Sequence, residues 1–206
     1  MAVTNKAASV LARLKNQTKQ QHINYQICLQ LFIQEEFLRR LSVSKFKDNM
    51  ILKGGMFIYT LTDFDSRPTK DIDFLVKNLS NDPTMIMNTM SEICKVPTGN
   101  DYIDIEVVNS EQITLEKKYP GVKTRFMAHI SNVRIPFSID IGIDDVITPG
   151  PILRRIPTRL DGFDEPEIYT YSLESTIAEK LDAILQRMET TSRMKDFYDI
   201  FYLSGI

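Results

Sequence analysis

The sequence predicts an α/β (α+β) fold, with helices toward both ends of the chain and most of the strands between them. Apolar residues recur at helical spacing over 21–41 and over 172–188, whereas they alternate with polar residues along 133–142. A short apolar segment at 50–52 precedes a Gly-Gly pair, as a strand that leads into a tight turn does. The 206 residues suit one α/β domain with a helical appendage, or two small domains.

The composition is close to that of ordinary globular proteins, with 43% hydrophobic and 25% charged residues. No apolar run approaches the ~18 residues that span a bilayer, and the N-terminus lacks the apolar centre of a signal peptide. We therefore expect a cytoplasmic protein without a membrane partner. Cys28 and Cys94 lie in apolar helical patterns and are expected to be buried free thiols, as in a reducing compartment.

The first half of the chain alternates between helical and strand patterns. Asp82 is a suitable helix cap, because Pro83 fits the first helical position after it. In order, the sequence predicts helices over 5–18 and 21–41, a strand over 50–52, a helix from the Gly-Gly turn to Leu61, a polar turn over 62–70, a strand over 71–76 and a helix over 83–94.

The second half begins with three predicted strands, near 102–109, 122–130 and 133–142. Proline and glycine are frequent over 149–166, and Ser172 can cap a helix that runs to Met188, before a last helix over 193–203. We therefore divide the chain into N-terminal helices plus a core (1–148), a linker or active-site rim (149–171) and a C-terminal helical segment (172–206).

One dense segment carries the chemistry. Gly54 and Gly55 follow the first strand, and Asp71 and Asp73 lie on the next one. Side chains two apart on a strand share a face, so the two carboxylates are expected to lie side by side. They repel each other, and a divalent cation with a preference for oxygen ligands, such as Mg²⁺, would remove that conflict. The spacing favours half of a metal site opposite a phosphate-binding turn.

This arrangement resembles the nucleotidyltransferase superfamily that includes DNA polymerase β, in which a Gly-Gly or Gly-Ser turn precedes Asp-x-Asp on the next strand. More closely, the chain is similar to the AbiEii-like toxins of type IV toxin–antitoxin systems. Four segments carry this likeness in the family's order: LKGG at 52–55, RPTKDIDF at 67–74, ESTIAEKLDAIL at 174–185 and SRMKDFYDIFYL at 192–203.

The resemblance implies a nucleotidyltransferase-type mixed sheet flanked by helices, and transfer of a nucleoside monophosphate from an NTP to a hydroxyl with release of pyrophosphate. It also implies Mg²⁺, or Mn²⁺, on Asp71, Asp73 and a third carboxylate from a neighbouring strand. We assign the third to Asp140, on the polar face of 133–142, with Asp104 as the competing candidate.

The resemblance further implies a nucleotide-binding set, and most members have a structural alternative. Lys53 is a phosphate contact or a solvated strand end, Arg67 touches phosphate or locks its turn by pairing with an acid, and Lys180 reaches the triphosphate or covers apolar surface. Asp196 reaches the nucleotide or anchors Lys180, whereas Asp199 is expected to be structural. The predicted set is Lys53, Gly54, Gly55, Arg67, Thr69, Lys180 and Asp196, while Arg193 and Lys195 serve phosphates or pair with nearby acids.

As an AbiEii-like toxin, the protein is expected to modify RNA, tRNA in particular, to have a cognate antitoxin and to act in phage defence. The alternatives are a small-molecule or protein acceptor, and a nucleotide-binding module without catalysis. The net charge of −2 argues against a protein that coats nucleic acid. Two basic groups remain candidates for phosphate contacts or are solvated surface: Lys6, Arg13, Lys15 and Lys19 near the N-terminus, and Arg154, Arg155 and Arg159.

Overall fold

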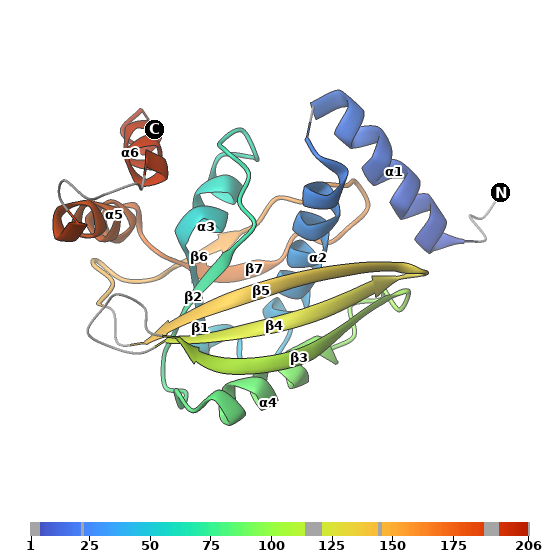
Figure 1. Ribbon diagram of the computed structural model, residues 1–206, viewed down its shortest axis with the longest axis horizontal. Coiled ribbons are helices and arrows are strands. Elements are labelled where there is room, and N and C mark those ends of the chain that lie inside the picture. Colours follow the sequence, from blue (N-terminus) through green and yellow to red (C-terminus); the bar gives the residue numbers. More distant parts are fainter. Residues whose placement is uncertain (1–4, 22, 114–120, 144–145, 188–193, 206) are drawn as a thin grey trace.

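The computed structural model describes residues 5–21, 23–113, 121–143, 146–187 and 194–205. Their elements follow the predicted order, and most boundaries agree within a few residues (Figure 1). The helices are α1 (Lys6–Gln21), α2 (Tyr25–Ser42), the 3₁₀ turn η1 (Lys47–Asn49), α3 (Gly54–Leu61), α4 (Pro83–Cys94), α5 (Leu173–Arg187) and α6 (Met194–Leu203). The strands are β1 (Met50–Lys53), β2 (Ile72–Val76), β3 (Ile103–Ile113), β4 (Gly121–Ile130), β5 (Val133–Ile143), β6 (Ile152–Arg155) and β7 (Glu167–Thr170).

The strands of the described residues form one seven-stranded sheet in the order β3-β4-β5-β2-β1-β7-β6. The pairs β2–β5 and β1–β7 are parallel, and the other neighbouring pairs are antiparallel. The predicted mixed sheet is therefore confirmed, and β1 and β2 lie at its centre.

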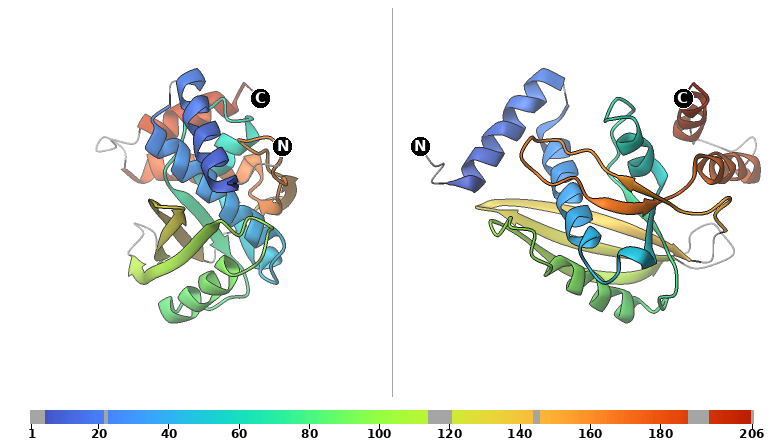
Figure 2. Two further views of the ribbon diagram at one scale, coloured as in Figure 1. Left: turned by 90° about the vertical axis from the view of Figure 1, so that its right-hand side faces the viewer. Right: turned by 180° about the vertical axis from the view of Figure 1, so that it is seen from behind.

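Helices α2 and α4 cover one face of the sheet (Figures 1 and 2). Phe37 of α2 packs against the rings of Phe74, Phe126 and Phe137, on β2, β4 and β5, with centroid distances of 6.3, 5.6 and 6.5 Å. These residues belong to the apolar core, and burial of such large rings is a main source of fold stability. The apolar side of the alternating β5 strand thus faces α2, and its polar side faces the opposite way.

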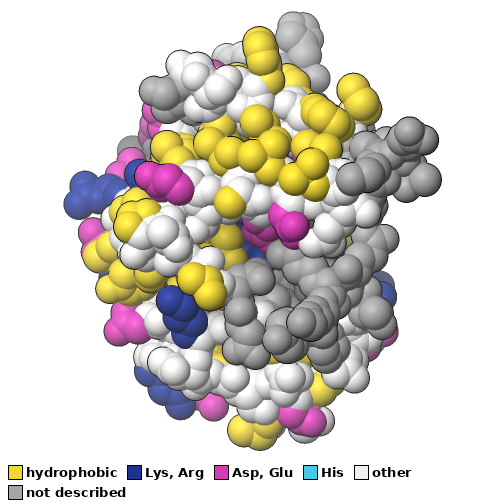
Figure 3. All heavy atoms as spheres, turned by 90° about the vertical axis from the view of Figure 1, so that its left-hand side faces the viewer, with side chains coloured by type: hydrophobic (Ala, Val, Ile, Leu, Met, Phe, Trp, Pro, Cys, Tyr) yellow, Lys and Arg dark blue, Asp and Glu magenta, His cyan; other side chains and the backbone are white. Residues whose placement is uncertain are grey.

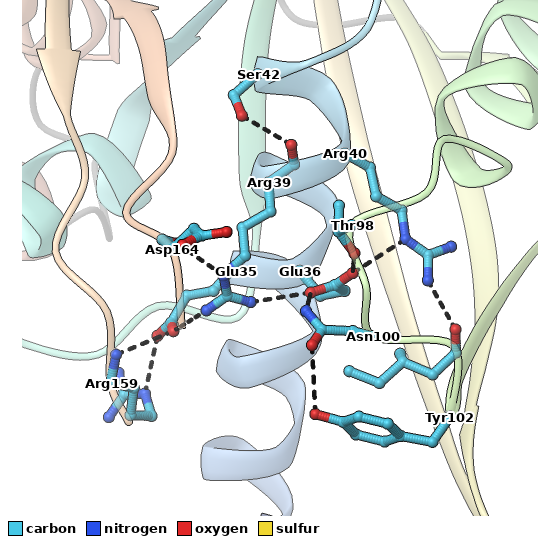
Figure 4. A network of polar contacts seen from close by, with 11 residues as sticks. Glu35, Glu36, Arg39, Arg40, Ser42, Thr98, Asn100, Tyr102, Arg159 and Asp164 are labelled. Atoms are coloured by element: carbon cyan, nitrogen blue, oxygen red, sulfur yellow. Dashed lines mark hydrogen bonds and ion pairs between the residues drawn. The ribbon is translucent and has the colours of Figure 1, made fainter. Parts of the chain in front are cut away.

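A buried ionic network connects α2 to the loop before β3 and to the segment between β6 and β7 (Figure 4). Arg39 pairs with Glu35 at 3.3 Å and with Glu36 at 3.1 Å, and Arg40 pairs with Glu36 at 3.2 Å. Arg159 approaches Glu35 from the segment between β6 and β7, with its Nε 3.3 Å from Oε1. Buried charges need such partners, so the network fixes the segment around Arg159 against α2.

Residues 149–171, expected to be a linker or rim, contain the strands β6 and β7. These strands extend the sheet, since β7 pairs with β1 and β6 pairs with β7. The sequence did not predict them because each is four residues long and lies in a segment rich in proline and glycine.

The predicted caps and thiols are confirmed. The Asp82 side chain accepts hydrogen bonds from the backbone N–H of Thr84 and Met85, and the Ser172 hydroxyl accepts one from Ser175 at 3.1 Å. Cys28 and Cys94 are buried free thiols. Within the described part of the chain, no helix has the length and apolarity to cross a membrane.

Candidate active site

A row of charged residues crosses five neighbouring strands in register. Asp73 of β2 lies opposite Lys53 of β1 on one side and opposite Asp140 of β5 on the other. Asp140 lies opposite Lys123 of β4, which in turn lies opposite Glu111 of β3. Side chains in register across neighbouring strands point to the same face, so the row occupies the face away from the Phe37 core. Two adjacent carboxylates are therefore flanked by a lysine on each side.

Asp73, at the centre of the row, lies in an environment that disfavours its charged form. Burial, and then the charge of Asp140, raise the pKa of Asp73 from 3.8 to about 6, against the opposing effect of Lys53. A partly buried carboxylate beside a second carboxylate disfavours the doubly ionised state. Such a pair suits a cation that both can share.

The Gly-Gly turn lies directly against the segment that carries the aspartates. Gly54 has φ +70°, and a Cβ there would lie 2.2 Å from the Oδ2 atom of Asp73. A Cβ on Gly55 would lie 3.0 Å from the Oγ1 atom of Thr69, whose hydroxyl donates to the Asp71 carbonyl at 3.4 Å. Helix α3 begins at Gly54, so the backbone N–H groups of its first turn, which have no acceptor within the helix, open beside Asp73.

Lys53 is not a solvated strand end, because it is only 8% exposed. Its Nζ lies 2.9 Å from Glu179 of α5 and 5.2 Å from the centre of the Tyr171 ring. The solvated alternative for Lys53 is therefore wrong, and its ammonium group lies beside the aspartate pair.

The C-terminal helices contribute a second, buried cluster of charges. The Lys180 ammonium lies 3.2 Å from Asp196 and 2.7 Å from Asp199. Arg67 contacts Asp199 with two hydrogen bonds, of 2.9 and 2.7 Å. Asp199, which we expected to be structural, therefore pairs with both Lys180 and Arg67. Arg67 pairs with an acid, and Asp196 anchors Lys180, as the structural alternatives for these two residues predicted.

Two ion pairs attach α5 and α6 to the strands of the site. Lys53 on β1 binds Glu179, the neighbour of Lys180, and Arg67, just before β2, binds Asp199. Figure 1 shows α5 and α6 together at the same side of the sheet, and Figure 3 shows this side with hydrophobic side chains above a hollow in which charged atoms are visible. Helices α5 and α6 therefore lie beside the predicted site.

Of the three predicted metal ligands, two are direct neighbours in the sheet and the third lies outside it. Asp73 and Asp140 are neighbours, whereas Asp71 is exposed and precedes β2 by one residue. Asp104 lies on β3, with β4 and β5 between it and β2, so it is not adjacent to the pair. Among the described residues, no three acidic, histidine or cysteine side chains gather closely enough to hold a metal ion. Asp71, Asp73 and Asp140 are thus not a preassembled three-carboxylate cluster.

Lys123 and Glu179 were missed by the sequence analysis. The Lys123 ammonium lies 2.8 Å from one oxygen of Asp140 and 3.0 Å from the other. The 122–130 pattern gave no sign of this contact, which depends on the register between β4 and β5. Lys195 is exposed, and Arg193 lies outside the described residues.

The two basic groups do not form one surface that leads to the aspartates. Helix α1 lies at the opposite side of the molecule from α5 and α6 (Figures 1 and 2). Arg159 is 6% exposed and is held by Glu35 and by the Tyr59 hydroxyl, which accepts a hydrogen bond of 3.0 Å. Both expectations for Arg159, a phosphate contact and a solvated surface residue, are therefore wrong, because its charge is compensated inside the protein. Arg155 is exposed.

A mixed sheet that pairs two aspartates beside a Gly-Gly turn, with a lysine and aspartate cluster on C-terminal helices, is the arrangement expected of a nucleotidyltransferase. The family model of the nucleotidyl transferase AbiEii toxins, of type IV toxin–antitoxin systems, matches residues 36–205. The chain belongs to this family. Membership implies an NTP substrate and an antitoxin partner.

Solved structures share the fold at low sequence identity. A proposed nucleotidyltransferase from H. pylori superposes with a TM-score of 0.55 and 15% identity, over 89% of this chain and 70% of that one. JHP933 from Helicobacter pylori gives a TM-score of 0.51 and 18% identity, over 85% of this chain and 66% of that one. A search of curated proteins found no significant match.

Proposed function

We propose that this AbiEii-family protein transfers a nucleoside monophosphate from an NTP to a hydroxyl of RNA, tRNA in particular, in a reaction that requires divalent cations. One observation carries the proposal: Asp73 and Asp140 are direct neighbours on β2 and β5, and the Gly54 turn lies against the Asp73 carboxylate. A phosphate-binding helix start thus adjoins a pair of carboxylates.

The donor set fits a hard divalent cation. The charge of Asp140 is one of the causes of the raised Asp73 pKa, and a shared cation removes that repulsion. Carboxylate oxygens suit Mg²⁺ and Mn²⁺, and Asp71 would supply a third carboxylate two residues before Asp73. When bound, the cations would stabilise the charge on the entering and leaving oxygens of an in-line displacement.

The protein's own groups have distinct parts in this reaction. The backbone N–H groups at the start of α3 bind phosphate oxygens, because Gly54 and Gly55 leave no side chain in the way. Lys53 and Lys180 supply positive charge to the triphosphate, and Asp196 and Asp199 hold the Lys180 ammonium in place. Thr69 and Arg67 position the turn before β2.

Asp140 has a second part, toward the acceptor. It accepts the proton of the attacking hydroxyl, because it is the carboxylate on the neighbouring strand and 21% of its side chain is open to solvent. The assignment of RNA as acceptor is supported by membership of a toxin family of type IV systems. We place the activity in the cytoplasm, as a growth-inhibiting reaction in phage defence that a cognate antitoxin controls.

The test is incubation with total RNA and each α-labelled NTP, with and without Mg²⁺. We expect label on RNA from one preferred NTP only when Mg²⁺ is present, and none with Asp140→Asn. Label on protein or on a small molecule would overturn the RNA assignment, and absence of transfer to any acceptor would overturn the proposed reaction.

A further inference from the structure

Lys123 on β4 is a charged residue of the row that the nucleotidyltransferase reaction does not by itself require. Its ammonium lies within 3.0 Å of both oxygens of Asp140, so a cation that bound both of these oxygens would have to displace it. The contact joins neighbouring strands in register and is partly buried, with side-chain exposures of 26% for Lys123 and 21% for Asp140.

The choice of partner is specific. Lys123 lies in register with Glu111 of β3 as well as with Asp140 of β5. Glu111 is bound by Arg125, two residues further along β4, at 2.7 Å. Arg125 therefore satisfies Glu111, and Lys123 turns to the carboxylate of the active site.

We propose that Lys123 is a positioning residue of the active site, an internal counter-ion that holds Asp140 and competes with the divalent cation for its oxygens. The inference rests on the proposed function, because it assigns the cation to Asp73 and Asp140.

The charges around Asp140 predict how tightly a divalent cation binds with and without a nucleotide. The four inner residues of the row, Lys53, Asp73, Asp140 and Lys123, hold two lysines and two aspartates, while Glu111 at the end of the row is paired with Arg125 and Lys53 also pairs with Glu179. A divalent cation on Asp140 would lie close to the Lys123 ammonium, which has the same sign of charge, whereas a cation that arrives with a triphosphate brings negative charge with it. The nucleotide-free protein should therefore bind divalent cations weakly, and Lys123 should be released from Asp140 when the cation enters.

The test measures Mn²⁺ binding to nucleotide-free protein, from the electron paramagnetic resonance signal of free Mn²⁺. Lys123→Met keeps the aliphatic stem and removes the charge, so it should bind Mn²⁺ about tenfold more tightly than the unmodified protein, because a unit charge a few ångströms away is lost. Lys123→Gln is the second variant and should change affinity in the same direction. Arg125→Met is the matched control: it removes a charge from the same strand and face, but one that pairs with Glu111, and it should change affinity much less.

Unchanged or weaker Mn²⁺ binding in both Lys123 variants would overturn the inference, since a merely structural lysine would give that result. An equal gain in Arg125→Met would also overturn it, because the effect would then come from general charge. Asp73→Asn in the Lys123→Met background separates this inference from the proposed function. Tight binding that persists there places the ion elsewhere and contradicts the proposed metal site, whereas loss of binding there, together with the gain in Lys123→Met alone, supports both.

Discussion

The Asp73 carboxylate lies so close to Gly54 that a methyl group added to the Gly54 Cα would collide with the carboxylate. A Cβ at Gly54 would lie 2.2 Å from Oδ2 of Asp73, and the backbone of Gly54 has φ +70°, which side-chain-bearing residues rarely adopt. The turn and the carboxylate thus constrain each other. The position of Asp73 on β2 therefore depends on Gly54, which directly follows β1.

Gly54→Ala should therefore impair the protein more than backbone strain alone explains. The positive φ costs roughly 1 kcal/mol, and displacement of the Asp73 carboxylate adds to that cost and removes nucleotidyl transfer. Gly162→Ala is the matched control, because Gly162 has φ +83° and open space around the added Cβ. Chemical denaturation and a transfer assay should show a similar or smaller stability loss for Gly162→Ala, with activity kept. Equal activity in the two variants would contradict the role of the contact.

Asp73→Asn should abolish transfer and stabilise the nucleotide-free protein at pH 7. The Asp73 pKa is raised from 3.8 to about 6, chiefly by burial and then by Asp140, so its ionised form is disfavoured in the folded state. A shift of this size corresponds to on the order of 2–3 kcal/mol. Asp104→Asn, on the exposed β3 position, should leave both activity and stability unchanged.

The sign of the pH dependence follows from the same shift. Below pH 3.8 the group is protonated in both the folded and the unfolded chain, so it contributes nothing. As the pH rises toward about 6 the unfolded chain ionises first, and the penalty on the fold grows until Asp73 itself ionises. The stability gain of Asp73→Asn over the unmodified protein should therefore vanish well below pH 3.8, grow as the pH rises from 3.8 to about 6, and be maximal above that. A gain that is independent of pH would show that ionisation of Asp73 is not its cause.

The fold was predictable where the periodicity was strong. The alternation along 133–142 identified β5 and placed Asp140 on its polar face, and the caps Asp82 and Ser172 fixed two helix starts. The short strands β6 and β7 were not predictable, because four residues hold too little periodicity to outweigh neighbouring prolines and glycines. Their place in the sheet is set by pairing with β1, a long-range contact.

The candidate site was predictable as far as motifs on single elements allowed. Asp73, Asp140, Gly54 and Lys180 were each predicted, and the structure places the first three side by side and Lys180 on the helix that pairs with Lys53 through Glu179. The partners Lys123 and Glu179 depend on strand register and on helix docking, which residue spacing does not contain. Arg159 was misjudged for the same reason, since its partner Glu35 is far away in the sequence and lies in the buried part of α2.

Arg159→Met should destabilise the protein without a specific effect on RNA. It leaves the fully buried Glu35 with Arg39 as its remaining cation, and loss of one partner of a buried pair costs roughly 3 kcal/mol. Arg155→Met, on the exposed side of β6, should leave stability within about 0.5 kcal/mol. Thermal unfolding measures both. A stable Arg159→Met variant with weakened RNA binding would restore the phosphate contact that the structure argues against.

Addition of NTP together with Mg²⁺ should stabilise the protein more than the sum of the two added separately. In the proposed site the cation bridges the phosphates and the Asp73–Asp140 pair, so each ligand raises the affinity for the other. At a hundredfold excess over its dissociation constant, a ligand contributes roughly 2.7 kcal/mol. Thermal shift with each ligand alone and with both measures this coupling, and purely additive shifts would argue against a joint site.

Variants of Lys180 can distinguish a structural role from a role in nucleotide binding, because its ammonium group is buried between Asp196 and Asp199. Lys180→Met should lose nucleotide use and also stability, roughly 3 kcal/mol, since the buried Asp196 and Asp199 both lose their contact with the Lys180 ammonium, although Asp199 keeps Arg67. Adding Asp196→Asn removes one of these carboxylate charges, so the double variant should regain much of the stability.

The double variant should nevertheless stay inactive if Lys180 binds the triphosphate. Stability is measured by denaturation, and nucleotide use by the Michaelis constant for the NTP and by NTP-dependent thermal shift. Asp196→Asn alone is the control: it keeps Lys180 paired with Asp199 at 2.7 Å and should retain measurable nucleotide binding. Recovery of transfer along with stability in the double variant would reduce Lys180 to a structural partner of α6, and the triphosphate would then have to be held by Lys53 and the start of α3 alone.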